Sequence, residues 1–308
     1  MLNTELKQVI ESRYRDLELI SGGTFGLVYS AQDRETQEKV AIKVFNAGNY
    51  KSSVNELKLL FRLKHPNIVK ILDVFYLKHS YALVFEYING GDLRARIENQ
   101  TTPISEKESI MIMAQIAAGL HYIHKNNIVH LDLKPENILV QHNADQSIYK
   151  LADFNISRFQ DTQHLGASYQ GSAIYMAPEQ FYQNADQKSD FYSLGIIWFE
   201  LLTGSPPFEG LLKELMKAHI QFAVPFERCQ ASEPVLDILK SLLAKDPQQR
   251  PATSQILLDS LTQLVEKYSL ETLSSQRTSL QWDPEQAAFY LKYLDPEIRS
   301  LLFPNLIS

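Results

Sequence analysis

The spacing of apolar residues in the first third of the chain predicts strands accompanied by a helix. Residues 40–43 read Val-Ala-Ile-Lys, an alternation typical of a strand that points Ala41 and Lys43 to one face. From Val54 to Leu63 the apolar residues recur at helical spacing instead. This part of the chain therefore predicts a small sheet together with one helix.

Further along, the pattern becomes that of helices. The apolar run at residues 83–88 predicts another strand, and a longer apolar run that ends near His124 predicts a long helix. We expect a short helix or cap at residues 1–12, strands and one helix over about 13–86, and mostly helices from residue 92 onward. We find no internal repeat and no low-complexity linker in the sequence.

Composition narrows the function classes without naming one. The 308 residues carry 30 Lys and Arg against 36 Asp and Glu, and without a basic stripe there is no reason to expect nucleic-acid binding. The single cysteine, Cys229, can form no internal disulfide, which suits a reducing compartment. No apolar stretch approaches the ~20 residues that span a bilayer. We therefore expect a cytoplasmic protein without a membrane anchor, although delivery into another cell by a secretion system stays open.

The densest group of chemically useful side chains lies at residues 130–137, His-Leu-Asp-Leu-Lys-Pro-Glu-Asn, with Asp153 following sixteen positions later. Asp132 can accept a proton from an attacking hydroxyl, and Lys134 can neutralise charge on a phosphoryl group in flight. Asn137 and Asp153 can hold Mg²⁺ against a polyphosphate. These residues resemble the catalytic loop and metal-binding segment of the eukaryotic-type protein kinases, and the resemblance implies ATP and Mg²⁺ as cofactors.

A glycine cluster near the start of the chain resembles the loop that covers the ATP phosphates in this family. Ser21 stands where the first glycine is usual, whereas Gly23 and Gly26 keep places where a side chain would block approach of the backbone to the phosphates. The resemblance implies cofactor contacts from this loop and the strands beside it, namely Ile20, Ser21, Gly22, Gly23, Gly26 and Val28.

A lysine in an apolar strand requires a partner, because burying an unpaired charge costs several kcal/mol. In the family, the lysine that corresponds to Lys43 reaches the α- and β-phosphates and pairs with a glutamate from the following helix. Glu56 is the candidate here. It could equally be a solvated helix residue, but the presence of both Lys43 and Asp153 favours the pairing.

The resemblance also implies the contacts to adenine and ribose. Adenine would pack on the small side chain of Ala41, between Val28 on one face and Leu139 on the other. The remaining contacts follow the predicted strand at residues 83–88: a gatekeeper, two residues whose backbones bond the adenine edge, and a carboxylate for the ribose, namely Phe85, Glu86, Ile88 and Asp92.

Other positions resemble the architecture of the family. Glu179 is the expected buried partner of Arg250, and Asp190 resembles the helix residue that anchors the catalytic-loop backbone. Lys134 and Ser172 resemble their counterparts in serine/threonine kinases, where such a serine would bridge the catalytic Asp and the lysine and admit short aliphatic alcohols. Serine/threonine specificity is therefore our expectation.

Two positions depart from the family pattern. Leu131 stands where an arginine usually binds a phosphate on the activation loop, so the electrostatic reason for phosphorylation to order that loop is lost. Asn155 replaces the usual glycine after Asp153-Phe154, where asparagine tolerates a positive φ better than most residues. Both changes leave the proton-transfer and metal-binding groups in place, which argues against a pseudokinase.

The resemblance implies an α+β, two-lobed protein-kinase-like fold, with a small antiparallel sheet lobe that carries one main helix and a larger, mostly helical lobe. We expect a cap at residues 1–12, a catalytic domain at 13–267 (lobes about 13–86 and 89–267) and a helical extension at 268–308. The apolar extension would pack on the large lobe, with autoinhibition or docking of a regulatory partner as alternatives.

The implied activity is ATP-dependent phosphorylation of serine and threonine hydroxyls in protein substrates. The alternative is a catalytically weak pseudokinase or signalling scaffold that binds ATP. The substrate and the oligomeric state cannot be read from the sequence, and Glu136 is the one acid that hints at basic substrates.

Overall fold

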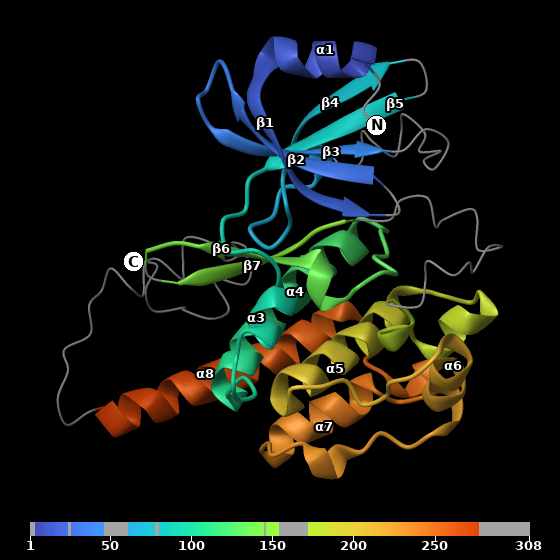
Figure 1. Ribbon diagram of the computed structural model, residues 1–308. Helices are drawn as coiled ribbons and strands as arrows, with labels where there is room; N and C mark the ends of the chain where they lie inside the picture. The colour runs from blue at the N-terminus through green and yellow to red at the C-terminus, as the bar shows by residue number, and fades with distance from the viewer. Residues whose placement is uncertain are drawn as a thin grey trace. The chain divides into compact units, whose positions relative to one another are not determined.

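The computed structural model describes residues 4–23, 26–45, 61–77, 80–144, 146–153 and 172–276. The chain divides into two compact units (Figure 1). The first comprises residues 1–95 and 135–172, and the second comprises residues 96–134 and 173–308. The chain therefore enters the second unit, returns to the first, and finishes in the second.

A five-stranded antiparallel sheet is the main element of the first unit. Its strands are β1 (Tyr14–Gly23), β2 (Gly26–Asp33), β3 (Lys39–Phe45), β4 (Ile71–Leu77) and β5 (Ser80–Glu86). Their spatial order is β1-β2-β3-β5-β4, which puts β3 in the middle. The strands predicted at residues 40–43 and 83–88 are confirmed within β3 and β5, although β5 ends at Glu86.

Helix α1 (Thr4–Arg13) covers one face of this sheet and explains the alternation along β3 (Figure 1). Alternate residues of β3 are buried in one cluster with two residues of α1: Val40, Ile42, Val44, Leu6 and Ile10. Burial of each such side chain stabilises the fold by about 1.5–3 kcal/mol. Ala41 and Lys43 stay half-buried on the opposite face, as the alternation predicts. The short helix expected at residues 1–12 is thus present and forms part of the core.

A two-stranded hairpin of β6 (Ile138–His142) and β7 (Ser147–Leu151) also belongs to the first unit. Residues just before β4 hold it there, because Val69 N–H donates to the Leu151 carbonyl and Leu151 N–H donates to the Asn67 carbonyl, each at 2.9 Å. The buried Asn67 side chain adds a bond from Nδ2 to the Tyr149 carbonyl at 2.9 Å. The turn η1 (Pro135–Asn137) leads into β6.

Helices make up the second unit. The long ones are α4 (Glu106–Lys125), α5 (Gln187–Thr203), α6 (Leu212–Gln221), α7 (Glu233–Leu242) and α8 (Ser254–Gln276). The short turns are η5 (Pro178–Tyr182), η6 (Phe226–Arg228) and η7 (Pro247–Gln249), and η4 (Ser172–Ile174) stands where the chain enters this unit for the second time. Helix α3 (Leu93–Glu98) lies where the chain passes between the units. Trp198 and Phe199 of α5 are fully buried, so α5 is the core helix of this unit. The long helix predicted to end near His124 is confirmed as α4.

The predicted α+β, two-lobed fold class is confirmed by an antiparallel sheet unit and a helical unit. Of the predicted helix from Val54 to Leu63, residues 61–63 are described: residues 61–62 are helical and Leu63 is not, so the helix ends one residue before the predicted end. Helix α8 runs on to Gln276, so the predicted extension begins as a continuation of a helix, and residues 277–308 lie outside the described part. The domain boundaries stay a prediction. Within the described ranges, no helix is both long enough and apolar enough to cross a membrane.

Candidate functional site

Lys43 and Asp153, which are 110 positions apart in the sequence, meet in the first unit. Nζ of Lys43 on β3 lies 2.5 Å from Oδ1 of Asp153, which follows β7. Ala152 N–H donates to the Asn137 carbonyl at 2.9 Å, so the segments that carry Asp153 and Asn137 are adjacent. Asp153 has a φ of 55°, a left-handed conformation that aspartate adopts more readily than most residues.

The side chains of Lys43, Asn137 and Asp153 have the chemistry to bind phosphate and a hard cation. The Lys43 side chain is only 14% exposed, so its ammonium group requires an anionic partner, whereas the Asp153 side chain is 45% exposed. Asn137 and Asp153 together offer an amide oxygen and a carboxylate oxygen, the ligand types that Mg²⁺ prefers. The residues present therefore fit the predicted metal.

The residues predicted to contact adenine also lie in the first unit. Val28 on β2 pairs with Lys43 on β3, and Ala41 pairs with Phe85 across β3 and β5, so these four residues occupy one stretch of the sheet. Val28, Ala41 and Leu139 are each half-buried. Their side chains are thus partly covered yet accessible.

The end of β5 is fixed by the side chain of Glu86. Its carboxylate accepts bonds from Lys70 N–H and from Lys150 Nζ, both at 2.8 Å. Its own N–H donates to the Lys70 carbonyl at 3.0 Å. Ile88 is half-buried two residues later. The contacts of Glu86 and Ile88 to adenine stay a prediction.

The turn after β5 packs tightly on β6, a contact that sequence reasoning missed. Gly90 N–H donates to the Val140 carbonyl at 2.8 Å, and Asn89 Oδ1 accepts from His142 N–H at 2.8 Å. A Cβ at Gly90 would overlap the Val140 carbonyl, so the approach requires glycine. Asp92 follows, and its Oδ1 caps α3 by accepting from Ala95 N–H at 2.8 Å. One carboxylate oxygen of Asp92 is therefore committed to the helix.

The glycine loop is described only at its two ends. Gly23 pairs with Gly26 across β1 and β2, while Ser21 and Gly22 are exposed and Ile20 is 51% exposed. A Cβ at Gly26 would overlap the Val44 carbonyl on β3, which gives this glycine a structural reason besides the one read from the sequence.

The catalytic-loop residues Asp132 and Lys134 lie in the second unit, with Lys134 Nζ 3.5 Å from Asp132 Oδ2. The fully buried Asp190 holds the backbone before them, accepting from His130 N–H at 2.9 Å and from Leu131 N–H at 2.8 Å. The anchoring role that the sequence predicted for Asp190 is confirmed.

Glu179 and Arg250 form the predicted buried pair, through bonds of 2.6 and 2.9 Å. Arg250 also donates to the Lys188 carbonyl at 2.9 Å, and Ser189 Oγ donates to Glu179 Oε1 at 2.7 Å. Both charges are therefore compensated inside the protein.

Glu136, the acid that hinted at basic substrates, has a cationic partner that the sequence did not reveal. Arg94 Nε donates to Glu136 Oε1 at 2.9 Å. The charge that hinted at basic substrates is thus already matched within the first unit, which weakens that hint.

Several predicted residues lie outside the described part of the chain. They are Glu56, the proposed partner of Lys43, and the whole segment 154–171 with Asn155. The bridge predicted from the Ser172 hydroxyl to Asp132 and Lys134 stays a prediction.

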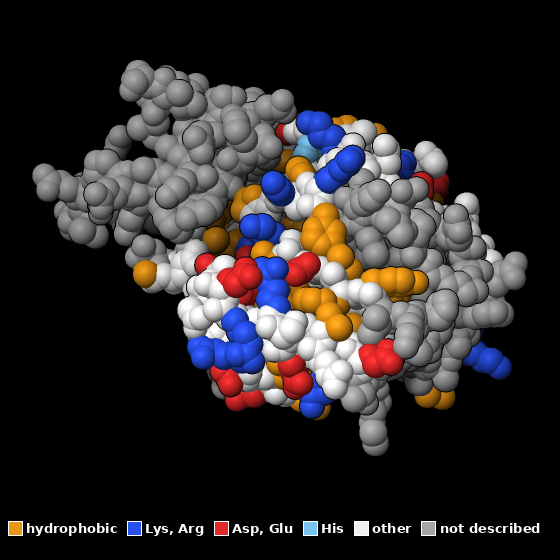
Figure 2. Space-filling view, turned by 90° about the horizontal axis from the view of Figure 1, so that it is seen from above, with side chains coloured by type: hydrophobic (Ala, Val, Ile, Leu, Met, Phe, Trp, Pro, Cys, Tyr) orange, Lys and Arg blue, Asp and Glu red, His pale blue; other side chains and the backbone are white. Residues whose placement is uncertain are grey.

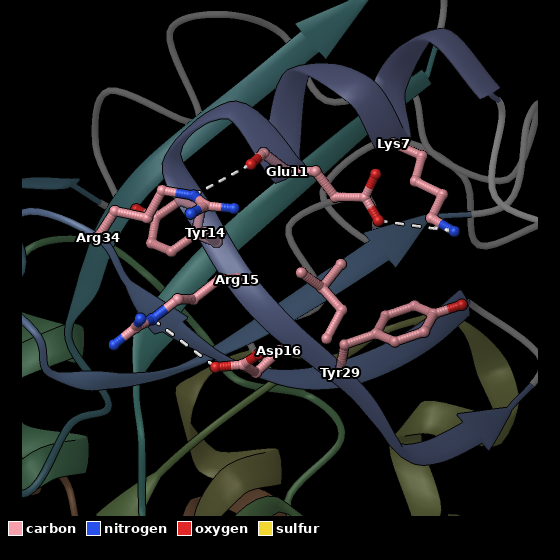
Figure 3. A pocket seen from close by; sticks show the side chains of 8 residues that line it. Lys7, Glu11, Tyr14, Arg15, Asp16, Tyr29 and Arg34 are labelled. Atoms are coloured by element: carbon pink, nitrogen blue, oxygen red, sulfur yellow. Dashed lines mark hydrogen bonds and ion pairs between the residues drawn. The ribbon is translucent and has the colours of Figure 1, made fainter.

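A cavity of about 440 Å³ opens elsewhere in the first unit, between α1, β1 and β2 (Figure 3). It contains none of the predicted site residues. Four of its charged side chains form pairs, with Lys7 3.6 Å from Glu11 and Arg15 3.7 Å from Asp16. Arg34 Nε donates to the Glu11 carbonyl at 3.3 Å. On the face of the molecule that is seen from above, basic and acidic side chains lie beside one another (Figure 2). We assign no chemistry to this cavity.

Comparison with known proteins agrees with the residues just described. A family model described as "Protein kinase domain" matches residues 14–261. Among curated proteins, the chain is 35% identical over 289 residues to serine/threonine-protein kinase PrkC of Bacillus subtilis, covering 90% of this chain and 44% of that protein.

Two further relatives come from eukaryotes. Calcium-dependent protein kinase 4 of Plasmodium berghei is 33% identical, covering 76% of this chain and 46% of the relative. Serine/threonine-protein kinase ATG1c of Arabidopsis thaliana is 34% identical, covering 75% of this chain and 33% of the relative. The chain thus matches less than half the length of each of these three proteins.

Proposed function

Because this chain belongs to the protein kinase family, we propose that it transfers the γ-phosphoryl group of ATP to serine and threonine hydroxyls of protein substrates. The contact between Lys43 and Asp153 carries the proposal. It joins the two residues that the chemistry assigns to the phosphates and to the metal, although they are far apart in sequence. If residues 130–137 and 153 were only a polar loop without a function, nothing would explain why Asp153 contacts Lys43.

Each group then has a defined task. Lys43 positions the α- and β-phosphates, and Asp153 and Asn137 hold Mg²⁺. The ion would neutralise charge on the phosphate oxygens when bound. Asp132 accepts the proton of the attacking hydroxyl, and Lys134 neutralises charge on the group in transfer.

The nucleotide base and sugar are held by the first unit. Val28, Ala41 and Leu139 cover the faces of adenine, while the backbones of Glu86 and Ile88 bond its edge behind the gatekeeper Phe85. The second carboxylate oxygen of Asp92, the one that does not cap α3, binds the ribose hydroxyls. The glycine loop (Ile20, Ser21, Gly22, Gly23 and Gly26) covers the phosphates.

Serine/threonine specificity rests on Lys134 and Ser172, and on the relatives being named serine/threonine-protein kinases. A peptide that offers one serine should accept label from ATP, and the same peptide with tyrosine in its place should not. Label on the tyrosine peptide alone would overturn this part of the proposal.

The proposed activity is tested by incubating the chain with γ-labelled ATP, Mg²⁺ and a protein substrate. Replacing Asp132 by the isosteric asparagine should lower transfer at least 100-fold, because a positioned base contributes about 10²–10⁴ in rate. The exposed Asp237 on α7 supplies a matched control, since Asp237→Asn should leave transfer unchanged. A wild-type chain that binds ATP but transfers no label would instead favour the signalling scaffold.

A further inference from the structure

Leu131 holds a backbone conformation that leucine seldom adopts. Its φ is 60°, in the left-handed region that favours glycine, asparagine and aspartate. The residue directly precedes Asp132, so the conformation at Leu131 sets the direction in which the catalytic carboxylate is presented. A conformation of this kind persists only where its surroundings hold it in place.

Two side chains form hydrogen bonds with the Leu131 backbone, one with its N–H and one with its carbonyl. Asp190 Oδ1 accepts its N–H at 2.8 Å, as expected from the sequence. Gln180 Nε2, which sequence reasoning missed, donates to its carbonyl at 3.0 Å. Both polar groups of the Leu131 backbone are therefore satisfied by side chains of the second unit.

Gln180 makes a second bond with the opposite polarity. Its Oε1 accepts from Ala177 N–H at 2.8 Å, at the start of η5. Only one orientation of the amide satisfies both partners, because a flipped amide would set oxygen against the Leu131 carbonyl and N–H against Ala177 N–H. Gln180 is only 6% exposed, so neither partner is readily satisfied by water instead.

We propose that Gln180 is a positioning residue that ties Ala177, near the end of the activation segment (residues 153–179), to the catalytic loop (residues 130–137) without any phosphate. This inference rests on the proposed kinase function. Leu131 stands where the family's arginine would bind a loop phosphate, and it carries no charge with which to do so. The amide of Gln180 joins Ala177 to the same stretch of backbone, and this link needs no modification of the loop.

The test replaces Gln180 by methionine, which keeps most of the volume and removes both bonds. Ser109→Ala is the matched control, because buried Ser109 likewise donates to a carbonyl, that of Glu106, and accepts from Trp198 Nε1. Both of these partners lie outside residues 130–137 and 177–180. We expect Gln180→Met to lower the single-turnover rate of phosphoryl transfer at least tenfold, with the KM for ATP within twofold of wild type. Ser109→Ala should lower the thermal midpoint comparably and keep the rate within twofold.

Hydrogen exchange supplies a readout that does not need activity. Amides of residues 130–134 should exchange faster in Gln180→Met and at the wild-type rate in Ser109→Ala. If the wild-type chain shows no kinase activity while exchange is still faster in Gln180→Met than in wild type, the proposed function is wrong and the tie stands. Unchanged exchange, or a transfer rate within twofold of wild type, would overturn the tie while the proposed function stands.

The isosteric variant Gln180→Glu isolates the donor to Leu131. Its carboxylate keeps an acceptor for Ala177 N–H, but only the protonated acid can donate to the Leu131 carbonyl. We expect a low rate at pH 8 and a ratio to wild type that rises as the pH falls to 6, whereas the Gln180→Met ratio stays flat. A flat ratio for Gln180→Glu would overturn the role of the donor.

Discussion

The two units hold their key ion pairs under opposite conditions. In the second unit the Arg250 side chain is fully buried, and two bonds join it to Glu179, whose side chain is 9% exposed. In the first unit a single bond joins Lys43 to Asp153, and nearly half of the Asp153 side chain is open to solvent. The chemistry of the two pairs is similar, so the difference lies in their surroundings.

Burial and bond number decide what each pair can do. A buried pair with several bonds is a fixed part of the fold, because removing one partner leaves an uncompensated charge. A partly open pair with one bond can exchange its partner for a phosphate or a cation with little loss of stability. We therefore expect mutations to separate the two pairs, with activity lost in the first unit and stability lost in the second.

The largest effect is expected from breaking the open pair. Asp153→Ala should lower the rate of phosphoryl transfer at least ~10³-fold, which is ~4 kcal/mol, because the predicted metal loses its carboxylate ligand. Lys43→Met should lower activity at least tenfold, or ~1.4 kcal/mol. Thermal unfolding of Lys43→Met should stay close to wild type, because methionine leaves no unpaired ammonium group and Asp153 is half exposed. Asp153→Ala should keep the fold but lower the midpoint, because the Lys43 side chain is only 14% exposed and loses this partner.

Lys39→Met is the matched control for the lysine. Lys39 lies on the same strand, is exposed, and has its Nζ over the Tyr87 ring. Its replacement should leave activity unchanged. A Lys43→Met protein that retained more than about a tenth of the wild-type rate would refute the role assigned to that lysine.

The second prediction breaks the buried pair. Arg250→Met should destabilise the protein by about 3–5 kcal/mol, because Glu179 is left charged and buried. The expected drop in the midpoint of thermal unfolding is roughly 6–20 °C. Arg228→Met, at an exposed arginine in the same unit, should cost less than about 1 kcal/mol. Adding Glu179→Gln to Arg250→Met should recover part of the loss, and a double variant less stable than Arg250→Met would contradict this account.

Sequence predicted those parts of the site in which a motif fixes the residue and its task together. Asp190 and the pair of Glu179 and Arg250 were found this way, since each belongs to a short recognisable run. The alternation along β3 likewise predicted that Lys43 and Ala41 share a face, because a strand has a strict period of two.

Contacts between ordinary residues far apart in the sequence could not be predicted. Gln180 meets Leu131 across 49 positions, and Arg94 meets Glu136 across 42. A glutamine or an arginine has many possible partners, and only the folded backbone selects one. The tight approach at Gly90 is similar, because a glycine in a turn does not reveal which carbonyl it faces.

A third prediction sharpens the comparison through pH. Burial, aided by the charge of Lys245, lowers the pKa of His219 to about 3 from its usual 6.5. Between these two values the unfolded chain binds a proton that the folded chain excludes. Stability is therefore complete above about pH 6.5 and is lost as the pH falls toward 3, by about 2 kcal/mol between pH 7 and pH 5.

Urea unfolding at pH 7 and pH 5 measures this loss. His219→Gln should flatten the pH dependence, although it lowers stability at pH 7 by removing the bond between Nδ1 and the Tyr192 hydroxyl at 3.0 Å. His142→Gln, at an exposed histidine of the first unit, serves as the control. Equal slopes for wild type and His219→Gln would assign the acid sensitivity to other groups.

The smallest effect is expected from phosphorylation of the activation loop. A phosphate on the loop stabilises the active state only where a cationic side chain can bind it. Leu131 stands at the position where the family has an arginine for this purpose. The buried Arg250 is already committed to Glu179. The loop between Asp153 and Glu179 holds the hydroxyls of Thr162, Ser168 and Tyr169. Phosphatase treatment, or alanine at these three positions together, should therefore change the rate less than tenfold, which is less than ~1.4 kcal/mol. A tenfold or greater loss would show that the argument from Leu131 is wrong.

Leu131→Arg tests the same point in reverse. A guanidinium at this position can bind a loop phosphate, so phosphatase treatment should lower the rate of Leu131→Arg more than it lowers the rate of wild type.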